Sequence, residues 1–149
     1  MSASLHLARP EHLDKVLALV AAFHTETGIA SSDEDRRAGV EPLLNGHPYG
    51  AIYLIGPTRA PIGYIAVTFG WSVAFGGLDG FIDELFIRPA VRGRGIATEV
   101  LTTLPKSLAG AGVRALHAEA DNRNESVQRL YARTRFDMRE DHVLMTKRL

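Results

Sequence analysis

The segment Phe81-Ile-Asp-Glu-Leu-Phe-Ile-Arg-Pro-Ala-Val-Arg-Gly-Arg-Gly-Ile-Ala-Thr-Glu-Val100 predicts a strand, a glycine-rich turn and a helix, in that order. Its first part is apolar and ends at Pro89, because proline has no backbone N–H to give to a sheet. From Ile96 to Leu108, apolar residues recur at spacings of three and four, as on one face of a helix. The N–H groups at a helix start have no partner inside the helix, and Arg92 and Arg94 add positive charge. The segment therefore predicts an anion site that suits a diphosphate.

Known phosphate-binding motifs narrow the choice of diphosphate. The dinucleotide fingerprint needs a third small residue where this chain has Thr98, and the nucleotide-binding loop needs a lysine where this chain has Ile96. What remains is Arg92-x-x-Gly95-x-Ala97, which resembles the acyl-CoA-binding motif Q/R-x-x-G-x-G/A of the GNAT superfamily of N-acetyltransferases. The alternative is a plain strand-to-helix turn with arginines that face solvent.

This resemblance implies acetyl-CoA as the co-substrate and names the residues that would hold it. The turn and the helix start would bind the pyrophosphate through Arg92, Gly93, Arg94, Gly95, Ile96, Ala97 and Thr98. The end of the strand would pair with the pantetheine arm through Leu85, Phe86 and Ile87. Backbone N–H groups around Phe86 would hold the thioester oxygen.

A second block, Asn124-Glu-Ser-Val-Gln-Arg-Leu-Tyr-Ala-Arg-Thr-Arg-Phe136, is similar to a later motif of the same family, N-x-x-A-x-x-L-Y followed by G-F. Val127 stands where alanine is usual and Arg135 where glycine is usual. A glycine there often allows a left-handed backbone, which arginine tolerates poorly. The resemblance implies that Asn124 and Tyr131 lie at the cofactor and that Tyr131 protonates the departing sulfur. A free tyrosine pKa of about 10 lies above a thiol pKa of about 8.5, so modest help would suffice.

Two acids, Asp83 and Glu84, lie in the middle of the predicted strand. Strand alternation predicts that Ile82, Glu84 and Phe86 share one face and that Asp83, Leu85 and Ile87 share the other. The segment is similar to the Glu-Asp-Phe-Phe-Val type of segment in diamine acetyltransferases. That likeness implies Asp83 as the base, through water, and Glu84 as a substrate ligand. A buried structural ion pair is the alternative for either acid, and which of the two is the base stays open.

Composition bounds the remaining choices. With 149 residues, 46% hydrophobic and 23% charged, the chain fits a single domain over residues 1–149. It has no apolar run near the roughly 20 residues of a membrane helix and no apolar signal core at the N-terminus, so we expect a cytoplasmic protein. No basic face with interleaved aromatic residues points to nucleic acid. We expect no metal, because cysteine is absent and the 6 histidines lack ligand spacing.

Charge and aromatic residues give weaker hints about the acceptor. Residues 1–87 hold 5 of the 17 Lys and Arg but 10 of the 17 Asp and Glu, although the net charge is zero. An acidic half favours a cationic substrate, while chance sampling of surface charges explains the same counts. Glu26 and Trp71 are candidate substrate-binding residues, the first beside the helix–helix connection and the second as a wall for an alkyl chain. The glycine-containing stretch around residues 69–75 is also a candidate dimer surface.

The periodicities predict an α/β (α+β) domain of the GNAT type. We expect a twisted, mixed, mostly antiparallel sheet of about 6–7 strands flanked by about 4 helices. Strands are predicted at residues 5–8, 51–55, 62–69, 81–87, 115–120 and 143–145, and helices at about 10–26, 36–44, 96–108 and 124–133. The predicted strand at 115–120 puts His117 and Glu119 on one face.

We therefore expect an acetyl-CoA-dependent N-acetyltransferase that moves the acetyl group directly to a primary amine. No covalent intermediate is expected, because the chain has no cysteine and no serine in a G-x-S-x-G turn. The expected acceptor is a small, polyamine-like molecule, with catalysis by Asp83, Glu84 and Tyr131. The alternatives are an acetyltransferase of protein N-termini or lysines and an acyl-CoA sensor without turnover. A homodimer is the expected assembly.

Overall fold

The computed structural model describes residues 3–149, and five strands form one sheet in the order β1-β2-β3-β4-β5. The strands are β1 (Leu5–Leu7), β2 (Gly50–Ile55), β3 (Gly63–Ser72), β4 (Gly77–Ile87) and β5 (Ala115–Ala118). Neighbours from β1 to β4 are antiparallel, whereas β4 and β5 are parallel because α3 crosses over between them. The mixed, mostly antiparallel sheet is as expected.

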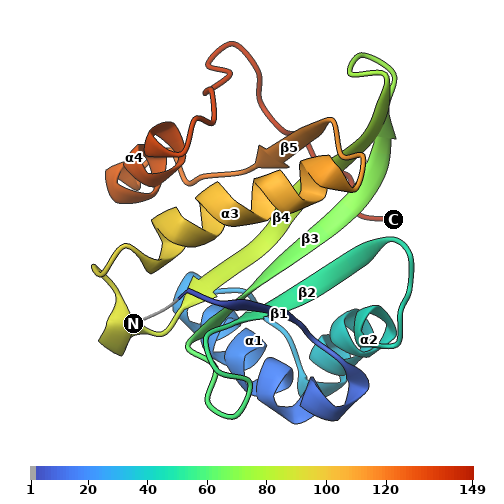
Figure 1. The fold of residues 1–149 in the computed structure, drawn as a ribbon, viewed down its shortest axis with the longest axis vertical. Helices are drawn as coiled ribbons and strands as arrows, with labels where there is room; N and C mark the ends of the chain where they lie inside the picture. Colours follow the sequence, from blue (N-terminus) through green and yellow to red (C-terminus); the bar gives the residue numbers. More distant parts are fainter. Residues whose placement is uncertain (1–2) are drawn as a thin grey trace.

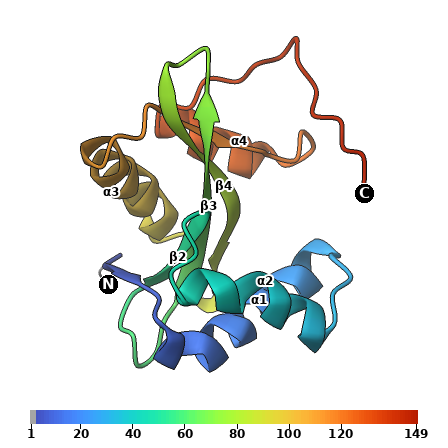
Figure 2. The same cartoon turned by 90° about the vertical axis from the view of Figure 1, so that its right-hand side faces the viewer.

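Four α-helices cover the sheet. They are α1 (Leu13–Thr27), α2 (Asp33–Leu44), α3 (Ile96–Gly110) and α4 (Glu125–Arg133), with short 3-10 turns at Pro10–His12 and Pro89–Val91. Helices α1 and α2 pack on one face and α3 on the other, while α4 lies beside α3 (Figures 1 and 2). Each face therefore has its own apolar core, and the sheet separates the two.

The expected last strand at 143–145 is wrong, and the sheet has five strands rather than 6–7. Val143, Leu144 and Met145 are 82%, 67% and 86% exposed. Residues 136–149 run along the outside of the molecule (Figure 1). A run of β-prone residues becomes a strand only when a sheet edge and an apolar face receive it. Here neither does, because the chain passes the short β5 without pairing.

Other boundaries shift by a few residues. Helix α2 begins at Asp33, since Ser32 accepts a hydrogen bond from the backbone N–H of Asp35 and caps the helix. Strand β3 reaches Ser72 and β4 begins at Gly77, so the glycine-rich stretch between them is the end of a long hairpin. Strand β5 ends at Ala118, two residues before its predicted end.

Strand β4 is open on one side over its last residues. Its pairing with β5 ends at Ile82 opposite Ala118, while its pairing with β3 continues to Ile87 opposite Gly63. The backbone groups of residues 83–87 that face β5 therefore have no strand partner. This splayed section begins at the two acids and leads to the glycine-rich turn.

A β-bulge lies at the start of the open section. Ala66 pairs with Glu84 and Val67 with Ile82, which leaves Asp83 as an extra residue in β4. The bulge corrects the predicted alternation: Ile82 lies in the α3-side core with Leu85 and Ile87, whereas Phe86 and the neighbours of Glu84 lie on the α1 side. Sequence alternation alone cannot reveal an inserted residue.

In the part of the chain that the structure covers, no helix combines the length and the apolar character that crossing a bilayer requires.

Candidate active site

The glycine-rich turn has the geometry of an anion site. Gly93 and Gly95 have φ angles of 75° and 77°, in the left-handed region that favours glycine, and Gly95 is the N-cap of α3. The first intrahelical bond runs from the N–H of Glu99 to the carbonyl of Gly95. The N–H groups of residues 96–98 therefore point out of the helix start. A Cβ at either glycine would meet no atom within 4 Å, so the space above the turn is open.

Arg92 is held beside this turn by Glu26 of α1. Its Nη1 and Nη2 donate to the two carboxylate oxygens at 2.7 and 2.6 Å, and its Nε donates to the carbonyl of Ile87 at 2.8 Å. The guanidinium also lies 5.6 Å from the ring centre of Phe86. The hydrogen-bonded pairing lowers the pKa of Glu26 and raises that of Arg92. The structure thus brings Glu26 to the turn rather than to the acids of β4.

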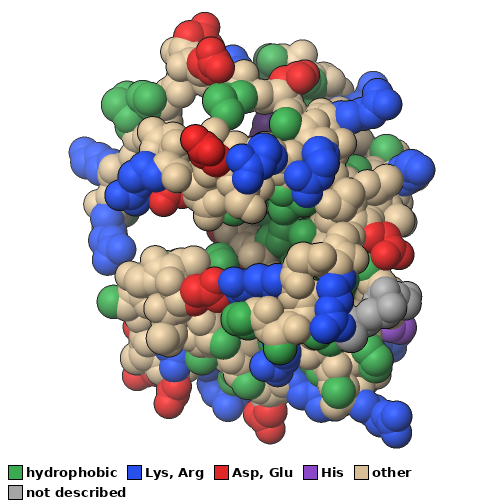
Figure 3. Space-filling view, turned by 90° about the vertical axis from the view of Figure 1, so that its left-hand side faces the viewer, with side chains coloured by type: hydrophobic (Ala, Val, Ile, Leu, Met, Phe, Trp, Pro, Cys, Tyr) green, Lys and Arg blue, Asp and Glu red, His purple; other side chains and the backbone are tan. Residues whose placement is uncertain are grey.

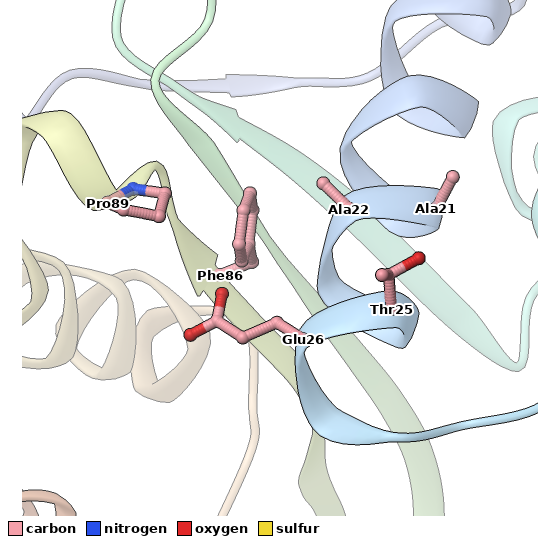
Figure 4. A pocket seen from close by; sticks show the side chains of 6 residues that line it. All are labelled: Ala21, Ala22, Thr25, Glu26, Phe86 and Pro89. Atoms are coloured by element: carbon pink, nitrogen blue, oxygen red, sulfur yellow. The ribbon is translucent and has the colours of Figure 1, made fainter.

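A pocket of about 540 Å³ lies between α1 and the end of β4. Its lining is almost entirely apolar apart from one carboxylate and one hydroxyl, and consists of Ala21, Ala22, Thr25, Glu26, Phe86 and Pro89 (Figure 4). The two alanines of α1 leave room opposite the Phe86 ring. The side of the molecule with α4 and the glycine-rich turn is hollowed, and Lys and Arg side chains lie around the hollow (Figure 3).

Glu84 is enclosed by donors on the α1 side of the sheet. The Tyr64 hydroxyl donates to its Oε1 at 2.8 Å, and His24 Nε2 lies 2.6 Å from its Oε2. The side chains of His24 and Glu84 are only 13% and 18% exposed. Each carboxylate oxygen of Glu84 therefore already has one hydrogen-bond partner from the protein.

Asp83 has the opposite environment. Asp83 is an exposed residue, yet partial desolvation by the surrounding protein raises its pKa. The negative charges of Glu84 and then Glu119 raise it further, and His24 opposes the shift. No hydrogen bond or ion pair within residues 3–149 engages the Asp83 carboxylate. A carboxylate with a raised pKa and no partner is suited to accept a proton.

Helix α4 carries the second motif. Asn124 is its N-cap, with Oδ1 accepting from the N–H of Val127 at 3.1 Å, so this residue has a structural task whatever else it binds. Burial raises the pKa of Tyr131, which keeps its hydroxyl protonated at neutral pH. Arg133 Nη2 lies 3.4 Å from Thr98 Oγ1 and links α4 to the start of α3.

Arg135 stands where the family motif usually has a glycine, and the backbone there is nevertheless left-handed. Arg135 has a φ of 70°, so the left-handed turn is kept without glycine. The N–H of Phe136 donates to Tyr131 and that of Arg135 to Ala132, and the Tyr131 and Phe136 rings are 5.1 Å apart. These are the bonds and the apolar contact of a Schellman cap, and together they hold Tyr131 in place.

The remaining predicted residues fall into two groups. Leu85, Phe86 and Ile87 lie in the open section of β4 with their side chains in the two cores, which leaves their backbone for pairing. Trp71 is 74% exposed near the hairpin end, opposite Leu78. It lies five residues along the strand from Asp83, on the order of 16 Å, and does not join the acids.

Sequence reasoning missed the partners of Glu84. His24 and Tyr64 come from α1 and β3, 60 and 20 residues away. Neither belongs to a local motif, and only the β3–β4 register brings them together. The sequence predicts only a strand face for Glu119, whereas this residue lies just beyond the end of β5. His117, which shared that predicted face, pairs instead with Asp79 at 3.2 Å.

Comparison with known proteins shows which family this chain belongs to. The Acetyltransferase (GNAT) family matches residues 13–136. A solved integron cassette protein, HFX_CASS3, from the mobile metagenome of Cole Harbour Salt Marsh is 30% identical, with 97% of this chain and 90% of that chain covered and a TM-score of 0.84. A comparison with the curated proteins found no match.

Two more distant structures share the fold. A probable acetyltransferase is 18% identical, with 98% and 97% of the two chains covered and a TM-score of 0.85. AAC(6')-Iy, solved with the bisubstrate analogue CoA-S-monomethyl-acetylneamine, is 16% identical, with both chains fully covered and a TM-score of 0.82. The family match covers most of this chain and includes both the glycine-rich turn and α4. The chain belongs to the acetyltransferase (GNAT) family and is an acyltransferase.

Proposed function

We propose that this protein transfers an acetyl group from acetyl-CoA to a small cationic primary amine. The observation that carries the proposal is the open section of β4. The carboxylates of Asp83, Glu84 and Glu119 lie at one end of it, and the glycine-rich turn, called the anion turn below, lies at the other. A cationic amine is attracted to the first end and a diphosphate to the second.

The residues present fit acetyl-CoA. The open space above Gly93 and Gly95 admits a diphosphate. The backbone of residues 83–86 that faces away from β3 has no strand partner and suits the amides of a pantetheine arm. Acetyl-CoA supplies an acetyl group activated as a thioester. AAC(6')-Iy, which shares the fold, was solved with a CoA-linked analogue.

The side chains supply the proton transfers. Asp83 takes a proton from the ammonium group, directly or through water, so that the amine nitrogen can attack the carbonyl carbon. The Tyr131 hydroxyl donates its proton to the sulfur as the carbon–sulfur bond breaks. Backbone N–H groups near Phe86 stabilise the negative charge on the carbonyl oxygen. No protein group becomes acetylated, so transfer is direct.

Calorimetric titration with acetyl-CoA tests the cofactor half of this proposal. We expect micromolar binding, lost in Gly95→Asp because an acid at a left-handed position both strains the turn and repels the diphosphate. Gly39→Asp is the matched control, since Gly39 lies exposed in α2 with no atom within 4 Å of its Cβ position. Absence of binding to the wild type at millimolar ligand would overturn the proposal.

An acceptor screen by release of free thiol tests the other half, with no protein thiol to interfere. We expect faster turnover with diamines and polyamines than with neutral amines or peptides. Faster turnover of peptide N-termini or lysines would favour a protein acetyltransferase instead. Tight binding of acetyl-CoA without turnover of any acceptor would favour an acyl-CoA sensor.

A further inference from the structure

A chain of hydrogen bonds leads from the protein surface to Glu84. Arg36 of α2 donates from Nη1 to Ser31 Oγ at 2.9 Å and also to the Ser31 carbonyl. Ser31 Oγ lies 2.7 Å from His24 Nδ1, and His24 Nε2 reaches Glu84. The chain joins α2, the α1–α2 connection, α1 and β4, and neither sequence motif contains any of its members except Glu84.

The two ends of the chain set the directions of its bonds for a neutral His24 ring. An arginine guanidinium can only donate, so Ser31 Oγ accepts from Arg36 and has its single hydrogen free for His24 Nδ1. The Glu84 carboxylate can only accept, so His24 Nε2 donates to it, and in the neutral ring Nδ1 then accepts from the Ser31 hydroxyl. Tyr64 donates to the other carboxylate oxygen, and burial, followed by the charge of Glu84, raises the pKa of that hydroxyl.

The bulge contains a second carboxylate, Asp83, next to Glu84 in the chain. Asp83 and Glu84 are consecutive, and Asp83 is the extra residue of the bulge, so the regular alternation of β4 is interrupted at this pair. Of the two, Glu84 accepts two hydrogen bonds, and Asp83 accepts none from residues 3–149. The structure therefore separates two chemically similar acids by their surroundings.

We propose that His24 and Tyr64 are positioning residues for the acetyl transfer: they hold Glu84 beside Asp83 and leave Asp83 as the carboxylate that takes the proton of the amine. This inference rests on the proposed function. The proton leaves the ammonium nitrogen and binds an Asp83 oxygen, and His24 and Tyr64 keep their own protons throughout. Glu84 acts on the reaction through its charge and not as a substrate ligand.

Four groups face Asp83 and set its response to pH. They are Glu84 on β4, Glu119 after β5, Tyr64 on β3 and His24 on α1. The two carboxylates favour protonation of Asp83, whereas a charge on His24 opposes it. Loss of the Glu84 charge must therefore make Asp83 a stronger acid.

Kinetics of His24 variants test the positioning role. We expect His24→Ala to lower kcat by about tenfold or more, the effect of losing one hydrogen bond to a charged group, with the KM for acetyl-CoA unchanged. His24→Gln, whose amide nitrogen can donate to Glu84 without titrating, should restore most of kcat. His47→Gln is the control, since this exposed histidine lies in the α2–β2 turn. Equal kcat values for His24→Ala and the wild type would overturn the proposal.

A carbon NMR titration of the Asp83 carboxyl group gives a readout that needs no turnover. We expect Glu84→Gln to lower the pKa of Asp83, while Asp137→Asn leaves it unchanged. Nitrogen NMR should show His24 with its hydrogen on Nε2. An Asp83 pKa that does not move in Glu84→Gln would overturn the inference even if the enzyme is active. A wild type without turnover would refute the proposed function and with it the positioning role, whereas the titration separately tests whether the charge of Glu84 raises the pKa of Asp83.

Discussion

The protonation of Asp83, the proposed base, is linked to the stability of the fold. Its pKa in the folded chain lies above the ordinary value of 3.8, because desolvation and two neighbouring carboxylates disfavour its charge. Protonation therefore stabilises the fold at a pH below 3.8, and this contribution is lost as the pH rises through the folded pKa. At neutral pH the ionised Asp83 therefore lowers stability, by a small amount because the residue is exposed to solvent.

Asp83→Asn should therefore have opposite effects on activity and on stability. We expect kcat to fall by about 10²-fold or more, since the proposed base is lost. We also expect a higher Tm than the wild type at pH 7, with the difference vanishing near pH 3, where Asp83 is protonated in both states. Steady-state rates and thermal unfolding at both pH values measure this. A Tm below that of the wild type at pH 7 would contradict the assignment.

Glu26 pairs with Arg92, and under the proposed function this pair competes with the diphosphate of acetyl-CoA. Both side chains are a little over two-fifths exposed, so the pair is weak, of order 0.2–1 kcal/mol. Glu26→Gln should free Arg92 and remove a nearby negative charge. We expect the Kd for acetyl-CoA to fall, by up to about fivefold, with a smaller gain at high salt.

A matched pair on α2 provides the control for Glu26. Arg37 donates to Glu41 at 2.8 Å, and these side chains are exposed to a similar extent. Glu41→Gln should leave acetyl-CoA affinity unchanged in calorimetry. Weaker binding in Glu26→Gln would mean that Glu26 orients Arg92 for the ligand instead of competing with it.

At the scale of elements, the sequence predicts those helices, strands and turns whose determinants lie within a few residues of one another. The turn from Arg92 to Ala97 depends on glycines, a proline and a helix start within a few residues, and its predicted geometry is confirmed. The bulge at Asp83 and the Glu26–Arg92 pair depend on register and on residues 66 positions apart, and neither was predicted. The strand expected at 143–145 failed for the same reason, because pairing is decided by what lies alongside.

The cap of α4 shows how packing overrides a local preference. Arg135 adopts a left-handed backbone, which costs a non-glycine residue of order 1–2 kcal/mol. The two backbone bonds and the contact of Tyr131 with Phe136 offset this strain. The family's usual glycine is thus dispensable here, although its absence lowers stability.

Arg135→Gly should stabilise the protein. Removing the strain stabilises the folded chain, but glycine also has more conformational freedom in the unfolded chain, which offsets part of that gain. We therefore expect a net gain of about 1 kcal/mol in the free energy of unfolding, or about 2–4 °C in Tm. Arg129→Gly, inside α4, should instead lower the Tm by a similar amount. A lower Tm for Arg135→Gly in thermal unfolding would show that the arginine side chain makes a stabilising contact.

At the scale of the whole molecule, the β3–β4 hairpin extends beyond the helices on either face of the sheet (Figures 1 and 2). Trp71, Val73 and Phe75 lie at its end and are 74%, 93% and 52% exposed. Several large apolar side chains gathered within five residues are typical of an interaction surface. They lie far from the anion turn, so an interface here would leave the candidate active site accessible.

A homodimer through this hairpin end stays a prediction, and light scattering after size exclusion tests it. We expect a mass of twice 16.2 kDa at micromolar concentrations for the wild type. Trp71→Lys with Val73→Lys should give the monomer mass without loss of Tm, because neither side chain is packed in a core. Tyr49→Lys changes an equally exposed aromatic residue outside the hairpin and should leave the dimer intact. A monomeric wild type across the micromolar range would refute the prediction, and a dimer that survives the double change would place the interface elsewhere.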